Sequence, residues 1–266
     1  MKELGISHLD TGARYPPLNP GMPEQLIGQA TEPSNRFIIH TKVYTNTATD
    51  GRGDLSRGPM KDSVHTLYAH RANPATPLER QIRNFNEQIQ QDHCNSGVSN
   101  TPVAVLRDIL ELCEQNGWKK PTCYRGNYNL ITREMEKTLL PLLRAHGMRY
   151  NGYGCAHAAD FLTTKLVNNQ YADTRFDEAN PLGELIQRQF ANETLQNAVC
   201  NFDKQLKAND LTPVEVAIRW VAHHSALEDD DGIILGVSKV LQVQDTVGFP
   251  RKGPLSGAIV SLAENF

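Results

Sequence analysis

Short apolar segments alternate with segments of helical character along almost the whole chain. The apolar segments have the length of strands, and they lie at residues 6–9, 37–43, 66–69, 97–99, 122–124, 148–153 and 233–237. When helices separate successive strands, the strands pair in parallel, because each helix returns the chain to the same edge of the sheet. The alternation therefore predicts an α/β fold with a parallel sheet that is either open or closed into a barrel.

Boundary signals support this reading for the helices. Pro102 precedes a segment whose apolar residues recur every three or four positions. Thr212 and Glu215 form a capping box, with Pro213 at the first helical position. Residues 45–65 join two predicted strands but are rich in turn-forming residues, and they show no helical pattern. A regular barrel is expected to carry a helix there.

Glycine-rich phosphate loops are missing from the sequence. No GxGxxG motif follows the first strand, and GxxxxGK[ST] does not occur. A nucleotide site of the Rossmann type is therefore excluded. A barrel, whose site is built from the loops after each strand, fits better.

Charge and cysteine content exclude several other classes of protein. The formal net charge is −3, so we expect no nucleic-acid partner and no attraction to an anionic membrane. The five cysteines lack a CxxC pair, which favours free thiols, and Cys155 and His157 have no suitably spaced third ligand for a metal. The N-terminal segment lacks a signal-peptide core, and no apolar run is long enough to span a membrane. We expect a cytoplasmic protein without a metal site.

Four residues near the ends of the predicted strands are candidates for catalysis: Asp10, Tyr15, Lys42 and His70. A lysine cation lowers the pKa of a neighbouring tyrosine so that it can donate a proton, a carboxylate holds the lysine, and a histidine orients a carbonyl oxygen. Taken singly, Asp10 is typical of a turn and His70 of a partly buried structural histidine. A lysine at a strand end is unusual without a partner, and Asp10 is the natural one. Together the four residues predict a carbonyl reductase.

Six segments occur in a recognisable order: DTGARY at 10–15, FIIHTK at 37–42, LYAH at 67–70, GVSN at 97–100, PTCYRGNYN at 121–129 and ILGVS at 234–238. They resemble, in order, the DTAxxY segment, the lysine strand, the LYLH strand, the GxSN strand end, the PxxYQxxYN segment and the GxS phosphate site of aldo-keto reductases. The resemblance runs through nearly the whole chain. It is strongest to the aflatoxin-aldehyde-reductase-like branch, which includes fungal members of secondary metabolism.

The resemblance implies a (β/α)8 TIM barrel that spans residues 1–266 as one domain. It also implies that NADPH is the cofactor and that the substrate is a small aldehyde or ketone, an intermediate of secondary-metabolite biosynthesis. Tyr15 would protonate the forming alkoxide, supported by Asp10, Lys42 and His70. The cofactor-binding residues carried over from the matched motifs are Ser99, Asn100, Arg125, Lys165, Gly236, Ser238 and Lys239. Among these, Asn100 would bind the nicotinamide carboxamide, and Ser238 with Lys239 would bind the 2′-phosphate.

The chain also departs from the pattern. It lacks the strand and most of the helix that precede the segment at 10–15 in the family, and a helix is expected where residues 45–65 have none. We therefore expect an incomplete barrel, whose open edges a second copy could cover in a homo-oligomer. Arg125 replaces a glutamine that binds the carboxamide, either as a new ligand or by drift. Asp160 would place a carboxylate near the cofactor diphosphate. The acidic and asparagine positions that bind adenosine in the family are Gln244 or Asp245 and Thr246 here.

These departures leave two alternatives to an active reductase of this length. One is a degenerate, non-catalytic relative that acts as a binding or accessory protein. The other is a shortened version of an active enzyme.

Overall fold

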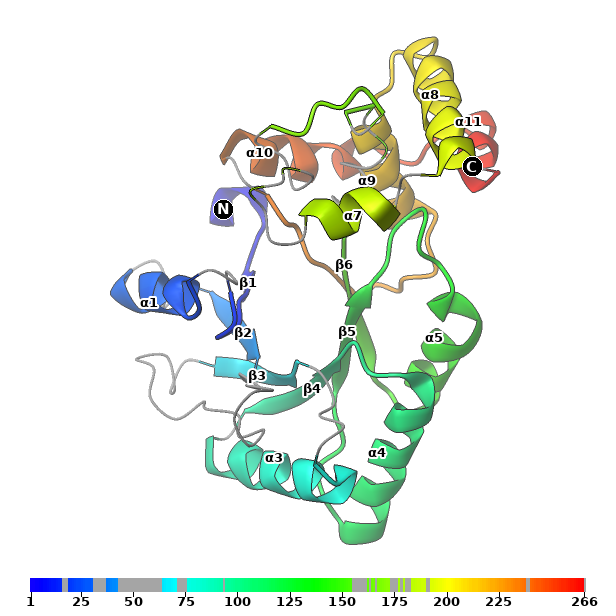
Figure 1. Ribbon diagram of the computed structural model, residues 1–266. Helices are drawn as coiled ribbons and strands as arrows, with labels where there is room; N and C mark the ends of the chain where they lie inside the picture. Colours follow the sequence, from blue (N-terminus) through cyan, green and yellow to red (C-terminus); the bar gives the residue numbers. More distant parts are fainter. Residues whose placement is uncertain are drawn as a thin grey trace. The chain divides into compact units, whose positions relative to one another are not determined.

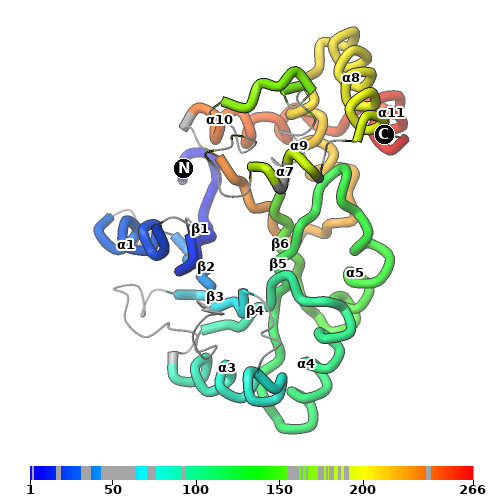
Figure 2. The backbone as a smooth tube through the Cα atoms, viewed as in Figure 1, coloured from blue at the N-terminus to red at the C-terminus, as the bar shows by residue number. Residues whose placement is uncertain are grey.

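We describe the fold from a computed structural model of the chain. It describes residues 1–15, 19–30, 37–42, 64–70, 76–92, 94–154, 162, 164–165, 167–172, 177, 179, 183–189, 192–237 and 240–265. Figure 2 follows the backbone from the N-terminus to the C-terminus. The chain divides into two compact units, which comprise Met1–Gly126 with Met135–Asn151, and Asn127–Glu134 with Gly152–Phe266. The single domain over residues 1–266 stays a prediction.

The strands follow one another in the sheet in the same order as in the sequence (Figure 1). They are β1 (His8–Asp10), β2 (Ile38–Lys42), β3 (Val64–Ala69), β4 (Asn95–Ser99), β5 (Cys123–Asn127), β6 (Arg149–Tyr153) and β7 (Gly232–Ile233). Each neighbouring pair from β1 to β5 is parallel. This is the strand order of a (β/α)8 barrel, with seven strands in the described part of the chain. The predicted α/β fold of an incomplete barrel is therefore confirmed.

The helices described in the first unit are α1 (Met22–Gln29), α3 (Leu78–Asp92), α4 (Val103–Asn116) and α5 (Met135–Ala145), with a 3-10 helix η1 at Lys2–Leu4. Helix α4 begins after Pro102, as predicted, and buries Leu106, Ile109, Leu110 and Cys113. It ends at Gly117, whose φ of 66° lies in the left-handed region that glycine adopts without strain. The segment 45–65, predicted to lack a helix, lies outside the described residues as far as residue 63.

Tyr68 fills the space between the strands of the first unit and is only 1% exposed. An added Cβ on Gly97 of β4 would lie 2.5 Å from two carbons of the Tyr68 ring, so this glycine permits a close approach rather than a turn. The Tyr68 hydroxyl accepts a hydrogen bond of 2.8 Å from Asn151 Nδ2, and Cys123 Sγ lies 3.2 Å from it. Side chains from β5 and β6 therefore hold the hydroxyl of this β3 tyrosine.

The second unit is mainly helical in its described residues. Its helices are α7 (Gly183–Gln189), α8 (Glu193–Lys207), α9 (Pro213–His223), α10 (Val240–Gly248) and α11 (Gly257–Glu264), with a 3-10 helix η3 at Pro250–Lys252. The predicted capping box is present, because Thr212 Oγ1 accepts a hydrogen bond of 3.2 Å from the Glu215 N–H. Trp220 of α9 is fully buried, and the Arg133 guanidinium lies 4.6 Å from the centre of its ring. Among the described helices, none combines the length and the apolar composition needed to cross a membrane.

Candidate active site

The strand order brings several of the predicted site residues to one edge of the sheet in the first unit. Asp10 and Lys42 are the last residues of β1 and β2, His70 follows β3, and Asn100 follows β4. Arg125 lies within β5. The carboxyl ends of parallel strands are where barrel enzymes place their chemistry.

Lys42 is buried against the Asp10 carboxylate. Its side chain is 0% exposed, and its Nζ donates hydrogen bonds to Asp10 Oδ1 at 3.0 Å and to Oδ2 at 2.9 Å. Nζ also donates to the backbone carbonyl of Thr11. Burial lowers the pKa of Lys42 to about 8, while Asp10 opposes this shift and Arg125 adds to it. The ammonium is therefore held by three oxygens, and its pKa lies below that of an exposed lysine.

Arg125 contacts the same carboxylate. Its NH2 atom lies 3.0 Å from Asp10 Oδ2, and its side chain is 8% exposed. The Asp10 side chain, at 15% exposed, thus accepts from two cations. Arg125 was expected to bind the cofactor, and that role stays a prediction. No sequence motif predicted its contact with Asp10.

Tyr15 and His70 lie beside this ion pair. Tyr15 Oη is 3.4 Å from His70 Nε2, and the two rings meet edge to face with their centres 5.6 Å apart. Lys42 Nζ lies 5.1 Å from the centre of the Tyr15 ring. An added Cβ on Gly12 would lie 3.3 Å from both Lys42 Cδ and Tyr15 Cε2, so a glycine here permits the close packing. The four predicted catalytic side chains are therefore brought together.

The strand end at β4 presents polar groups of a kind that binds an amide. Ser99 is fully buried, while Asn100 is exposed and has a φ of 52°. The Asn100 N–H donates to the Arg125 carbonyl at 3.2 Å, and its Nδ2 donates to Ser99 Oγ at 3.0 Å. A positive φ is uncommon outside glycine and is best tolerated by asparagine. The turn thus holds the Asn100 side chain next to the strand end.

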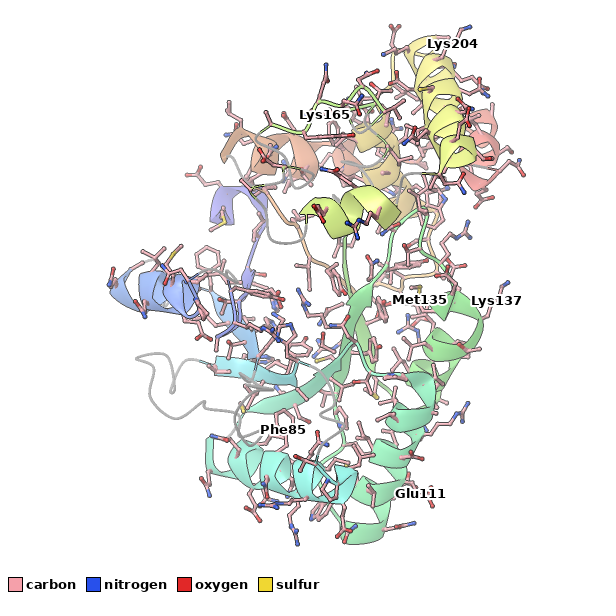
Figure 3. All side chains as sticks on the ribbon, viewed as in Figure 1. Phe85, Glu111, Met135, Lys137, Lys165 and Lys204 are labelled. Carbon is pink, nitrogen blue, oxygen red and sulfur yellow. The ribbon has the colours of Figure 1, made fainter. Side chains whose placement is uncertain are left out.

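The other predicted cofactor-binding residues belong to the second unit. Lys165 is exposed (Figure 3), and its backbone carbonyl accepts a hydrogen bond of 2.8 Å from the Gln170 N–H. Gly236 is also exposed. The remaining residues of the cofactor prediction, Ser238 and Lys239, lie outside the described residues, as do Cys155, His157 and Asp160. In the described part of the chain, no group of three or more His, Cys, Asp or Glu residues could hold a metal ion.

Sequence reasoning missed a row of imidazoles behind the ion pair. His8 Nδ1 and His40 Nε2 share a hydrogen bond of 2.8 Å, and the His40 and His65 rings meet edge to face at 5.6 Å. His40 pairs with Asp10 in the register of β1 and β2. Burial lowers the pKa of His40 to about 4, so the ring is neutral at physiological pH. The spacing of two between His40 and Lys42 was the available signal, because alternate residues of a strand share a face.

A second contact that the sequence did not suggest ties β2 to α1. Thr41 Oγ1 donates a hydrogen bond to the Glu24 carboxylate. Thr41 is buried and immediately precedes Lys42, so its side chain points to the opposite face of the strand. Helix α1 is therefore attached to the strand that carries the lysine.

Comparison with known proteins agrees with this geometry. The sequence model of the Aldo/keto reductase family matches residues 1–258. The chain belongs to the aldo/keto reductase family. It is 32% identical to aflatoxin B1 aldehyde reductase member 2 of Mus musculus, over 97% of this chain and 75% of that protein. It is 28% identical to oxidoreductase sirO of Leptosphaeria maculans, over 99% and 82% of the two chains. Aldo-keto reductase pigE of Monascus ruber is 26% identical, over 92% and 78%.

Membership confirms the family that the sequence motifs suggested. Aldo/keto reductases are oxidoreductases that act on carbonyl and alcohol groups with a nicotinamide cofactor, and this chain is an enzyme of that class.

Proposed function

We propose that this protein is an NADPH-dependent reductase that converts an aldehyde or a ketone into an alcohol. The observation that carries the proposal is the buried Lys42–Asp10 pair beside Tyr15 and His70. A buried lysine without function is costly, because desolvation penalises its charge. Beside the ring of a tyrosine, the same lysine has a use in proton transfer.

The residues at the strand ends fit a nicotinamide. Asn100 offers amide groups at the end of β4, next to Ser99 Oγ, and both lie on the same edge as Asp10 and Lys42. We propose that Ser99 and Asn100 hold the carboxamide of the nicotinamide, with Arg125 close by. When bound, the reduced nicotinamide supplies a hydride to the carbonyl carbon.

For the phosphates we propose the remaining residues of the sequence prediction: Lys165, Gly236, Ser238 and Lys239. Ser238 with Lys239 would bind the 2′-phosphate through charge-assisted hydrogen bonds, which is the reason to propose NADPH rather than NADH. A clear preference for NADH in binding would contradict this assignment.

The protein's own groups account for the proton. Tyr15 Oη and His70 Nε2, 3.4 Å apart, can both reach one carbonyl oxygen. His70 orients that oxygen, and Tyr15 donates its phenolic proton as the alkoxide forms. The Lys42 cation, 5.1 Å from the ring centre, stabilises the phenolate that remains. Asp10 holds Lys42 in that place.

A nucleotide titration tests the proposal. Purified protein should quench NADPH fluorescence on binding and should oxidise NADPH in the presence of an aromatic or aliphatic aldehyde. Tyr15→Phe should retain the quenching and lose the oxidation. Folded protein that binds no nucleotide at millimolar concentration would favour the non-catalytic alternative instead.

The pathway, the cellular location and the oligomeric state of the protein are proposals as well. We propose a place in a biosynthetic pathway, since fungal oxidoreductases are among the relatives. We propose the cytoplasm as the location, because the cysteines that the structure describes as free would stay reduced there: Cys94, Cys113, Cys123 and Cys200. A homo-oligomer, which size-exclusion chromatography with light scattering would detect, is proposed to cover open strand edges.

A further inference from the structure

Two buried cations share one carboxylate in the first unit. Asp10 Oδ2 accepts from Lys42 Nζ at 2.9 Å and from Arg125 NH2 at 3.0 Å, and Oδ1 accepts from Lys42 at 3.0 Å. Arg125 comes from β5, which is 115 residues further along the chain. The trio therefore carries two positive charges and one negative charge in a largely buried place.

The groups around Lys42 determine how strongly its charged, ammonium form is favoured. The charged and titratable groups that face it are Asp10 from β1, Arg125 from β5, Glu24 from α1, His40 from its own strand and Tyr15 from the loop after β1. Asp10 and Glu24 favour the ammonium. Arg125 disfavours it in two ways, because it repels the ammonium and because it occupies an oxygen that Lys42 also uses.

We propose that Arg125 is a positioning residue that holds Asp10 and thereby sets the pH at which Lys42 loses its charge beside Tyr15. Guanidinium groups stay protonated in proteins, so Asp10 keeps an ion pair when Lys42 becomes neutral. The trio then changes from a net charge of +1 to zero without leaving the carboxylate unpaired. The catalytic part of this inference rests on the proposed reductase function, and the electrostatic part does not.

The consequence is an upper pH limit for reduction that depends on Arg125. With Arg125 present, the pKa of Lys42 is about 8, so the cation beside Tyr15 is lost just above neutral pH. Without the guanidinium, the carboxylate would serve Lys42 alone and the ammonium would persist to higher pH. Burial is the largest cause of the lowered pKa of Lys42, and Arg125 lowers it further.

The test is a lysine titration followed by NMR. Protein labelled with 13C at the lysine ε carbon is titrated from pH 6 to 11, and the signal that disappears in Lys42→Met identifies Lys42. In Arg125→Gln we expect the midpoint of this signal to rise by on the order of one pH unit. Arg107→Gln is the matched control, because it removes an arginine charge from the exposed face of α4 in the same unit. The midpoint in this control should stay where it is in the unaltered protein.

Activity provides the second readout. The alkaline limb of the NADPH-dependent reduction rate should move upward in Arg125→Gln, whereas a purely structural role would lower the rate without moving the limb. Equal NMR midpoints in Arg125→Gln and the unaltered protein would overturn the inference. If Arg125→Gln does not fold, Arg125→Met should give the same upward shift, and Asp10→Asn should lower the Lys42 midpoint.

The two proposals fail separately. A protein that reduces no carbonyl but shows the shifted Lys42 midpoint would refute the reductase function and leave the role of Arg125 towards Lys42 intact. An active reductase whose Lys42 midpoint is the same with and without Arg125 would refute the role of Arg125 and leave the reductase function intact.

Discussion

Removing the charge of Asp10 is the sharpest perturbation of the site. Asp10→Asn keeps the shape of the side chain but leaves the Lys42 ammonium, which is 0% exposed, and the Arg125 guanidinium, which is 8% exposed, without their shared carboxylate. Removing one partner of a buried ion pair costs about 3–5 kcal/mol. We expect Asp10→Asn to lower the free energy of unfolding at pH 7 by about that amount.

The loss should depend on pH in a defined direction. The pKa of Lys42 falls from its ordinary value of 10.5 to about 8 on folding, and without Asp10 it should fall further. A lysine whose folded pKa is lowered destabilises the protein at low pH, and this cost declines as the pH rises toward the unfolded value. Above about pH 8 the folded Lys42 is neutral in both proteins. The loss of unfolding free energy in Asp10→Asn should therefore be smaller by about 1 kcal/mol at pH 9.5 than at pH 7. The share of the loss that comes from the unpaired Arg125 guanidinium should remain at both pH values.

Urea unfolding at pH 7 and at pH 9.5 measures both quantities, provided the dependence on urea concentration is the same in both proteins. Asp108→Asn, an exposed position on α4, is the control and should change the stability little at either pH. A deficit of the same size at both pH values would show that Lys42 does not carry it. A deficit below about 1 kcal/mol at pH 7 would show that the carboxylate does not hold the two cations in solution.

Three further changes test other parts of the molecule. Tyr15→Phe should lower the rate of carbonyl reduction by about 10²–10⁴-fold while NADPH still binds, as steady-state rates and fluorescence titration would show. Gly97→Ala should lower the free energy of unfolding by about 1–3 kcal/mol, because its Cβ would lie 2.5 Å from the Tyr68 ring; equal thermal and urea midpoints would contradict this. The pKa of His40 is lowered to about 4, so the unfolded chain binds its proton first and stability should fall between about pH 6.5 and pH 4. His40→Leu should flatten that acid limb in urea unfolding at stepped pH, and an unchanged limb would assign it to other groups.

The grouping of the predicted catalytic side chains could be foreseen because each of them follows or ends a short apolar segment of the sequence. Asp10, Lys42 and His70 each end an apolar segment, and parallel strands bring such ends together whatever lies between them. The start of α9 was equally local, since Thr212 caps the Glu215 N–H three residues later. In both cases the signal lies within a few residues.

Helices α1 and α3 and the contact between Arg125 and Asp10 were not predicted, because their local sequence signals are weak or their partners are distant in the chain. Helix α1 begins after Gly21, which is in the left-handed conformation and gives no side-chain cap. Helix α3 is rich in Gln and Asn, so its apolar face is narrow. The contact of Arg125 with Asp10 joins residues 115 apart, and its sequence context matched a cofactor ligand of the family. No pattern in one sequence could place these two side chains together.

The contacts of β2 also affect the segment that carries Tyr15. This segment begins at Asp10, the last residue of β1, and ends at Glu24 of α1. Asp10 binds Lys42 and Glu24 binds Thr41, so both ends of the segment are attached to adjacent residues of β2. Closing a loop in this way restricts the conformations open to the residues inside it. Placing the Tyr15 phenol beside the Lys42 ammonium costs conformational entropy, and this cost is therefore met when the chain folds. Less ordering is left for the moment when substrate arrives, which is how preorganised sites gain rate.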